Sequence, residues 1–299
     1  MIRRFAAGTA VATGLALSLT GCLGAATDKA GETGSKIQLT AAQVLGKAAE
    51  KTSTTDSFKA SMSMQGSSKE GDMTMSGSMQ YRTKPDIAYS MKFDQMVVAG
   101  QKMSGMESVL VDRTMYMKMT FLTDLFKQFG GGGGAAPATK PWIKISLDEV
   151  GAQAGINIDQ LLEQSRQMDP VQNTKMLTAS KDARLVGKEN VEGVDTTHYT
   201  GTYSMADAMS KLTPEQQKAL QKSAAQSGMD NMAFDLWVDD QQLPKKMVMK
   251  SAPGATEQMT MTMVYRDYGK PVQIAAPPAD QVSDYSQMMK SLQPGMPRS

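Results

Sequence analysis

The chain has 299 residues, of which 40% are hydrophobic and 21% are charged, and its formal net charge is +2. This length suits one large domain or two small ones, and the near-neutral charge offers no basic face that would favour nucleic acid as a partner. A single cysteine excludes disulfides within the chain, while 27 methionines stand against 7 phenylalanines and 2 tryptophans, an imbalance that needs an explanation.

Residues 1–21 have the pattern of a cleaved export signal. Arg3 and Arg4 precede an uncharged stretch that ends in Leu-Thr-Gly-Cys, closing at Cys22. This ending resembles the bacterial lipobox, which implies cleavage before Cys22, a thioether-linked diacylglycerol and a lipid anchor on the outer face of a membrane. The alternatives are a secretory peptide with an incidental cysteine, or a transmembrane helix, for which the stretch is too rich in Gly, Ala, Thr and Ser. Without the signal, 30 basic and 30 acidic residues remain.

A tether and a helix are expected next. Residues 22–39 are small and polar, which predicts a flexible link between the acylated cysteine and the domain. Thr40 is a suitable N-cap, and Ala41, Val44 and Leu45 recur at helical spacing, so a helix of about 13 residues should follow.

From Ser57 onward, hydrophobic residues alternate with Ser, Thr and Lys, which is typical of antiparallel strands buried on one face. Methionine is the most frequent hydrophobic residue in these runs. Alternating runs cover residues 58–65, 73–81, 87–93, 115–120, 196–203, 232–238, 247–249 and 259–265, with shorter strands expected at 142–145 and 186–189. Turn signals separate the runs, among them Val111-Asp112-Arg113.

The remaining segments predict loops and short helices. Residues 130–141 read as a flexible Gly/Ala/Pro loop, and residues 277–299 read as a disordered C-terminal tail. Helices are expected at residues 147–151, 158–167, 170–179, 204–212 and 214–226.

These elements predict an α+β fold, with one domain over residues 40–276. About ten sequential strands should form a single large curved antiparallel sheet, a half-barrel, with the helices on its concave face. Such an arrangement leaves room for an apolar cavity between the sheet and the helices.

The alternating methionines allow three interpretations. They could be core alone, or core plus the lining of an apolar pocket, because methionine adapts to ligands of varied shape such as acyl chains. The third is a Cu(I) site, because thioethers are soft ligands; Met-x-Met also arises on any strand that uses methionine. The candidate ligand-binding residues are Met62, Met64, Met75, Met79, Tyr89, Met91, Met117, Phe234, Leu236, Met249 and Met261.

Beside the Gly-rich loop lies a second candidate segment. Phe121, Leu122, Leu125 and Phe126 are apolar, and we expect them to gate the mouth of the cavity, since a flexible loop next to an apolar helix suits a lid. The alternative is an ordinary helix packed on the sheet.

Nothing in the sequence indicates an enzyme or a cofactor. His198 is the only histidine, on a predicted strand, and one histidine cannot build a metal cluster, so a hydrogen-bonded strand residue is expected. The motifs of nucleophile elbows, zinc proteases, P-loops and dinucleotide sites do not occur.

Three stretches carry a family resemblance: Trp142–Ile145, Gly187–Tyr199 (GKENVEGVDTTHY) and Leu236–Pro244 (LWVDDQQLP). Together with the lipobox they resemble actinobacterial lipoproteins of the LppX/LprAFG group, from about Thr40 to Asp284. The resemblance implies a U-shaped half-barrel similar to the lipoprotein carriers LolA and LolB, an apolar cavity for long acyl chains, and lipid transfer across the cell envelope without catalysis. This chain departs from the group in its methionine lining and its glycine run.

The expected function is therefore a membrane-anchored, extracytoplasmic lipoprotein that binds an acyl lipid. Its expected partners are the membrane, through the anchor, the lipid, and envelope transport proteins. The alternatives are a packed-core interaction lipoprotein without a ligand, and a methionine-rich Cu(I)-binding protein.

Overall fold

The computed structural model describes residues 39–68, 71–103, 105–119, 140–155, 157–159, 162, 172–212, 214, 217, 231–252, 255 and 258–287. Every described residue belongs to one compact unit, residues 39–299. The predicted signal, tether and Gly-rich loop lie outside the described residues, as does almost all of the helices predicted at 158–167 and 214–226.

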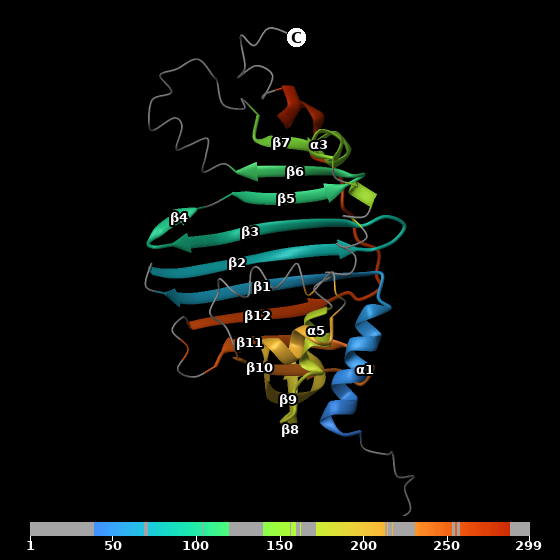
Figure 1. The fold of residues 1–299 in the computed structure, drawn as a ribbon, viewed down its shortest axis with the longest axis vertical. Coiled ribbons are helices and arrows are strands. Elements are labelled where there is room, and N and C mark those ends of the chain that lie inside the picture. Colours follow the sequence, from blue (N-terminus) through green and yellow to red (C-terminus); the bar gives the residue numbers. More distant parts are fainter. Residues whose placement is uncertain are drawn as a thin grey trace, which may run out of the picture. The chain divides into compact units, whose positions relative to one another are not determined.

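Thirteen strands form one sheet within the described part of the chain, in the order β13-β7-β6-β5-β3-β2-β1-β12-β11-β10-β9-β8, with β4 paired to β3 (Figure 1). The strands are β1 Ser57–Ser68, β2 Gly71–Arg82, β3 Ala88–Val98, β4 Gln101–Met103, β5 Met106–Val111, β6 Thr114–Met119, β7 Trp142–Ser146, β8 Arg184–Val191, β9 Val194–Ser204, β10 Asn231–Val238, β11 Pro244–Ser251, β12 Gln258–Arg266 and β13 Val282–Asp284. All strand pairings are antiparallel except that of β13 with β7. The predicted fold class is confirmed: a single large, open, curved and mostly antiparallel sheet with few helices.

The sheet consists of two runs of sequential strands joined at its middle. Strands β1 to β7 form one run and β8 to β12 the other, and the two meet where β1 pairs with β12. The register at this seam places Lys59 opposite Arg266 and Ser67 opposite Gln258. Short turns make most connections within each run, because antiparallel neighbours connect end to end, whereas 22 residues separate β6 from β7 and 26 separate β9 from β10.

The first helix, α1 (Ala41–Ser53), begins where the sequence predicts. The Thr40 side chain accepts a hydrogen bond from the backbone N–H of Gln43, and the Gln43 side chain accepts one from the backbone N–H of Thr40, which completes a capping box. The helix buries Val44, Leu45 and Ala48 on one side. Its apolar spacing therefore sets which side packs on the sheet.

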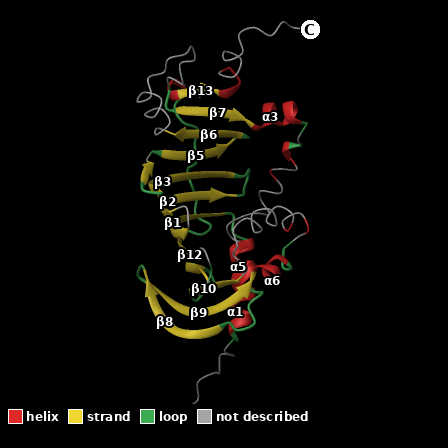
Figure 2. Ribbon diagram, turned by 60° about the vertical axis from the view of Figure 1, so that its left-hand side comes forward, coloured by secondary structure: helices red, strands yellow, loops and turns green. Residues whose placement is uncertain are grey.

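Three described helices cover one face of the sheet. Helices α1, α5 (Gln172–Leu177) and α6 (Met205–Met209) lie together beside strands β8–β12 (Figure 2). Leu45 of α1, Leu177 of α5 and Ala208 of α6 join one hydrophobic cluster with Phe58, Phe234 and other residues of the sheet. Helix α3 (Leu147–Ala154) follows β7 directly, with Ser146 as its N-cap.

A second, smaller cluster lies on the opposite face of the sheet. Its strand residues are sequence neighbours of residues in the large cluster, and neighbouring residues of a strand point to opposite faces. Val109 and Val111 of β5 pack there with Trp142 of β7, and they are covered by Val272 and Ile274 from the segment after β12. This segment ends in β13, which pairs with β7. Residues 282–284 therefore lie in the sheet, although the sequence analysis assigned them to the tail.

Strands β4, β5 and β13 were not among the predicted strands. In β5, Val109, Leu110 and Val111 are consecutive and all buried, with Leu110 in the large cluster and the two valines in the small one. A strand buried on both faces loses the polar alternation that reveals other strands. Strands β4 and β13 have only three residues each.

Candidate functional site

The strand register brings the predicted ligand-binding residues onto one face of the sheet. Met64 on β1 lies opposite Met75 on β2 and Met261 on β12. Met249 on β11 lies opposite Met261, and Met91 on β3 lies opposite Met79 of β2, so the same face of the sheet continues across these strands. This methionine face includes all eleven candidates that the alternating strands supplied: Met62, Met64, Met75, Met79, Tyr89, Met91, Met117, Phe234, Leu236, Met249 and Met261.

One part of the methionine face is a filled core. Met79, Phe234, Leu236 and Met249 are buried in the large cluster, in which α1, α5 and α6 also take part. Side chains packed this way hold the helices on the sheet, because burial of apolar area is the main stabilising contribution. In the described structure these four residues form core rather than open lining.

The other candidates are less enclosed. Met62, Tyr89, Met91 and Met261 are partly buried and pack against the edge of the large cluster. Met64, Met75 and Met117 are partly buried too, but they belong to neither cluster. The methionine face therefore extends beyond the core that the described helices cover.

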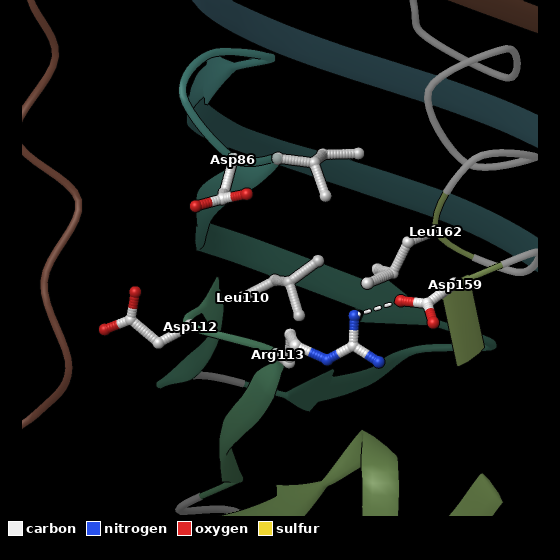
Figure 3. A pocket seen from close by; sticks show the side chains of 7 residues that line it. Asp86, Leu110, Asp112, Arg113, Asp159 and Leu162 are labelled. Carbon is white, nitrogen blue, oxygen red and sulfur yellow. Dashed lines mark hydrogen bonds and ion pairs between the residues drawn. The ribbon is translucent and has the colours of Figure 1, made fainter.

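A cavity of about 440 Å³ opens on the same side of the sheet. Its apolar lining comes from Ile87, Leu110 and Leu162, the last two of which are labelled in Figure 3. Ile87 and Leu110 also belong to the large cluster. Leu110 lies opposite Tyr89 in the sheet, so the cavity floor continues the methionine face. None of the eleven candidates lines this cavity, and their role in binding stays a prediction.

An ion-pair cluster forms the polar rim of this cavity. The Arg113 guanidinium donates to both carboxylate oxygens of Asp148, with Nε at 3.0 Å from each, and also to Asp159 (Figure 3). Asp148 holds the pKa of Arg113 above its ordinary value, with Asp159 adding to this effect, and Arg113 in turn lowers the pKa of Asp148. Because both partners are acidic, the three side chains together carry a formal net charge of −1.

Sequence reasoning identified Arg113 only as a turn residue. The turn gives Asp112 and Arg113 positive φ angles, and the N-cap at Ser146 brings Asp148 into the first turn of α3. Acidic residues are favoured in that position by the helix dipole. The available signals were an arginine in a strand turn and an acid at the second position of a capped helix. Their proximity depends on the pairing of β6 with β7.

His198 lies on the opposite face, as the middle of a polar cluster. Its ring stacks on Trp237, with centroids 4.1 Å apart, and its nitrogens lie 2.9 Å from Glu189 and 3.0 Å from Asp235. A carboxylate accepts but does not donate, so both bonds form together only on the protonated ring. The structure confirms the hydrogen-bonded strand residue that the sequence predicts.

The two carboxylates of this cluster are stabilised in their charged form. The hydrogen bond from the Trp237 indole is the main cause that lowers the pKa of Glu189, and His198 adds to it. Burial acts to raise the pKa of Asp235, but hydrogen bonds from His198 and Lys250 outweigh it and lower that pKa. A polar cavity of about 400 Å³ adjoins Glu189, Thr196 and Asp240.

The remaining predicted residues lie outside the described structure. These are Cys22 and the proposed gate at Phe121, Leu122, Leu125 and Phe126. In the part of the chain that is described, no group of three or more His, Cys, Asp or Glu side chains gathers as a metal site. No helix among the described residues is long and apolar enough to cross a membrane.

Comparison with known proteins shows a similarity to one lipoprotein family over part of the chain. The model of the LppX_LprAFG lipoprotein family matches residues 156–274, which include β8–β12 and two of the three stretches that carry the resemblance. This segment is similar to the LppX/LprAFG lipoprotein family. The match includes β10 and β11, which carry Phe234, Leu236 and Met249 of the packed part of the methionine face.

Two curated relatives come from Streptomyces. An uncharacterised 31.2 kDa protein of Streptomyces griseus, from the rplA-rplJ intergenic region, is 32% identical over 175 residues, covering 57% of this chain and 56% of that protein. A putative lipoprotein of Streptomyces coelicolor is 30% identical over 184 residues, covering 60% of this chain and 54% of its own. The chain thus spans about half the length of the curated relatives it matches.

Solved structures of LppX/LprAFG lipoproteins are also similar. LprF from Mycobacterium bovis superimposes with a TM-score of 0.48 at 13% identity, covering 79% of this chain and 96% of LprF. LppX from Mycobacterium tuberculosis gives a TM-score of 0.43 at 11% identity, covering 79% of this chain and 98% of LppX.

Proposed function

We propose that this chain is a lipoprotein that binds the acyl chains of a lipid on its methionine face. One observation carries the proposal: the register gathers all eleven alternating candidates on one face, and that face continues past the filled core to Met64, Met75 and Met117. Flexible, unbranched methionine side chains can adapt to chains of varied shape. The match of residues 156–274 to a lipoprotein family supports the same function.

The cavity beside Arg113 offers a position for the polar end of such a lipid. Leu110 continues the apolar surface into the cavity, while Asp86, Asp112 and Arg113 provide hydrogen-bonding groups at its rim. A ligand with apolar chains and a neutral, hydroxyl-rich head matches this lining, because Arg113 is already paired with two acids. Binding of this kind requires no catalysis and no cofactor.

Native mass spectrometry of the full-length protein, purified in a mild detergent and released in the gas phase, tests the binding function. We expect a stoichiometric adduct that dissociates to an acyl lipid on activation. A protein mass that stays unchanged after incubation with total envelope lipids would contradict the proposal. That result would favour the second candidate, a packed-core interaction lipoprotein. The burial of Phe234, Leu236 and Met249 supports this second candidate.

The membrane anchor at Cys22 belongs to the same proposal. Its support is the lipobox pattern and the family. In a detergent phase-separation experiment, the protein expressed in a bacterial host should enter the detergent phase, and Cys22→Ser should stay in the aqueous phase. Equal partitioning of the two proteins would contradict an anchor at this residue.

Carriage of the bound lipid through the cell envelope is the role we propose for this binding. A fluorescent phospholipid transferred between two vesicle populations measures it, because a carrier accelerates exchange in proportion to its concentration. A protein that binds the lipid without accelerating exchange would instead be a sensor or a structural component.

A further inference from the structure

A row of six methionines crosses the methionine face from strand to strand. Each member lies directly opposite the next in the strand register, so the side chains form one continuous line. In spatial order the methionine row is Met249 on β11, Met261 on β12, Met64 on β1, Met75 on β2, Met96 on β3 and Met103 on β4.

We propose that the methionine row binds a soft monovalent metal ion, Cu(I) or Ag(I), through thioether sulfur. Thioethers are neutral, soft ligands that select such ions over hard divalent cations. The metal site shares Met64, Met75, Met249 and Met261 with the proposed lipid-binding face, but it depends on sulfur and not on apolar area.

The spacing in the row suits such coordination. Directly opposite residues of antiparallel strands have Cβ atoms about 4.5–5.5 Å apart. Methionine has three rotatable bonds, so the sulfurs of two flanking residues can swing toward the sulfur of the residue between them. Met64 has methionine on both sides, as do Met75, Met96 and Met261.

The row is also accessible. Met249 is buried, but the other five members are only partly buried, and Met64, Met75, Met96 and Met103 belong to neither hydrophobic cluster. These four sulfurs are therefore not required to fill a core. β-branched residues would suit the same strand positions better, so the choice of methionine there needs another reason.

Other positions on the same face lack this continuity. Met117 lies between Ser108 and Ile143, and Met73 lies between Gly66 and Val98. A shorter line runs from Met247 through Met263 to Met62, but the first two are buried and the sulfur of Met263 accepts a hydrogen bond from Tyr265. The methionine row is thus the accessible line of thioethers among the described strands.

The experiment titrates the full-length protein, in mild detergent and chloride-free buffer, with Ag(I) as a redox-stable probe. Native mass spectrometry counts bound ions, and the ε-methyl signals of ¹³C-labelled methionine report which residues respond. We compare Met64→Leu/Met75→Leu with the matched control Met73→Leu/Met117→Leu. Leucine keeps the volume and apolarity of each site and removes only the sulfur.

Saturable binding of at least one Ag(I) is expected, with affinity falling at least about tenfold in Met64→Leu/Met75→Leu and less than about twofold in the control. A second variant, Met96→Leu/Met103→Leu, should weaken binding in the same way if the first is poorly folded. Absence of saturable binding, or equal loss in test and control variants, would overturn the proposal. Acyl-lipid binding should survive in Met96→Leu/Met103→Leu, whose residues are not among the lipid-binding candidates, so failure of the metal site and failure of the lipid site can be distinguished. Competition with a colorimetric chelator measures the affinity for Cu(I), which is kept reduced. The variants should rank in the same order for Cu(I) as for Ag(I).

Discussion

The hydroxyl of Tyr203 donates a hydrogen bond to the sulfur of Met249 over 3.6 Å, inside the large core. Tyr89 and Tyr265 make the same kind of bond to Met115 and Met263, at 3.2 and 3.4 Å. Burial raises the pKa of Tyr203 to about 12, so the phenol stays a neutral donor at neutral pH. Methionine on this face is therefore an acceptor as well as a filler, which leucine could not be.

Met249→Leu should lower the free energy of unfolding by about 0.5–1.5 kcal/mol, because it leaves the buried Tyr203 hydroxyl without this acceptor. Tyr203→Phe removes the donor, and adding it to Met249→Leu should recover part of the loss. Urea denaturation of the four proteins in this cycle measures the coupling. If Met249→Leu is as stable as the wild type, sulfur contributes nothing as an acceptor.

Gly77 lies where the register of β2 against β3 shifts. It is on the methionine face, directly opposite Met62 of β1. A Cβ atom there would collide with the backbone carbonyl oxygen of Lys92 and lie 3.2 Å from Cα of Phe93. Gly77→Ala should therefore destabilise the sheet by about 1–3 kcal/mol.

The control for this change is Gly66→Ala on β1, where the nearest atom would be 3.6 Å away. It should be neutral within about 0.5 kcal/mol. Thermal unfolding of the two variants gives the comparison, and similar losses in both would show that strand glycine itself, rather than the close approach to Lys92, is what matters.

A charge placed on the methionine face should weaken lipid binding. Met75→Asp puts a carboxylate among apolar side chains, and we expect lipid affinity to fall at least about tenfold, equivalent to about 1.4 kcal/mol. Ser78→Asp adds the same charge to β2 on the other face and should leave binding unchanged. The lipid adduct is quantified for both variants after their thermal unfolding has been compared, and equal adducts would place the ligand elsewhere.

The cluster around His198 should make stability sensitive to acid. Folding lowers the pKa values of Glu189 and Asp235, so their contribution is fully present above the unfolded values of roughly 4 and is lost as pH falls through the folded values. Denaturation midpoints should therefore drop from pH 5 to pH 3.

Asp235→Asn lacks its contribution at every pH, so its midpoint should start lower and fall less over the same range. Asp240→Asn, an exposed residue in the turn after β10, should keep the wild-type slope. Parallel curves for Asp235→Asn and the wild type would exclude Asp235 as a source of the acid sensitivity.

The segment after β12 should stabilise the sheet by covering the face opposite the methionine face. Ile274 is 7% exposed and packs in the small cluster with Trp142. Ile274→Ala should cost about 2–4 kcal/mol, whereas its exposed neighbour in Gln273→Ala should change stability by less than about 0.5 kcal/mol. Chemical denaturation distinguishes these outcomes, and equal stability of the two variants would mean that the segment is not part of the folded core.

Local patterns were enough to predict most of this fold. Alternation located β1, β2 and β10, and the same alternation fixed which of their residues share a face, because side chains of a strand point to opposite sides in turn. β5 was not predicted, because Leu110 and its neighbouring valines are buried in different clusters on the two faces of the sheet, so the strand has no apolar–polar alternation.

What the sequence could not predict depends on pairing between distant strands. The alternation within each strand did not show that Phe234 would be buried while Met75 would be only partly buried. The difference depends on which part of the face the helices cover. Nor did the alternation bring Arg113 to Asp148, or align six methionines in one row. Each of these required the order of strands in the sheet.

That order has a consequence for how the chain reaches its final state. Arg266 on β12 donates a hydrogen bond to Ser61 on β1, across 205 positions of the sequence. The two runs of hairpins can form early from local contacts, but the join between them has a high loop-closure cost and should form late. Until it does, β1 and β12 each expose an open edge rich in Met-x-Met, which can add a strand from another molecule. The newly made protein is therefore most prone to aggregation before its two halves meet, and a chaperone that shields these two strands would have the greatest effect on its yield.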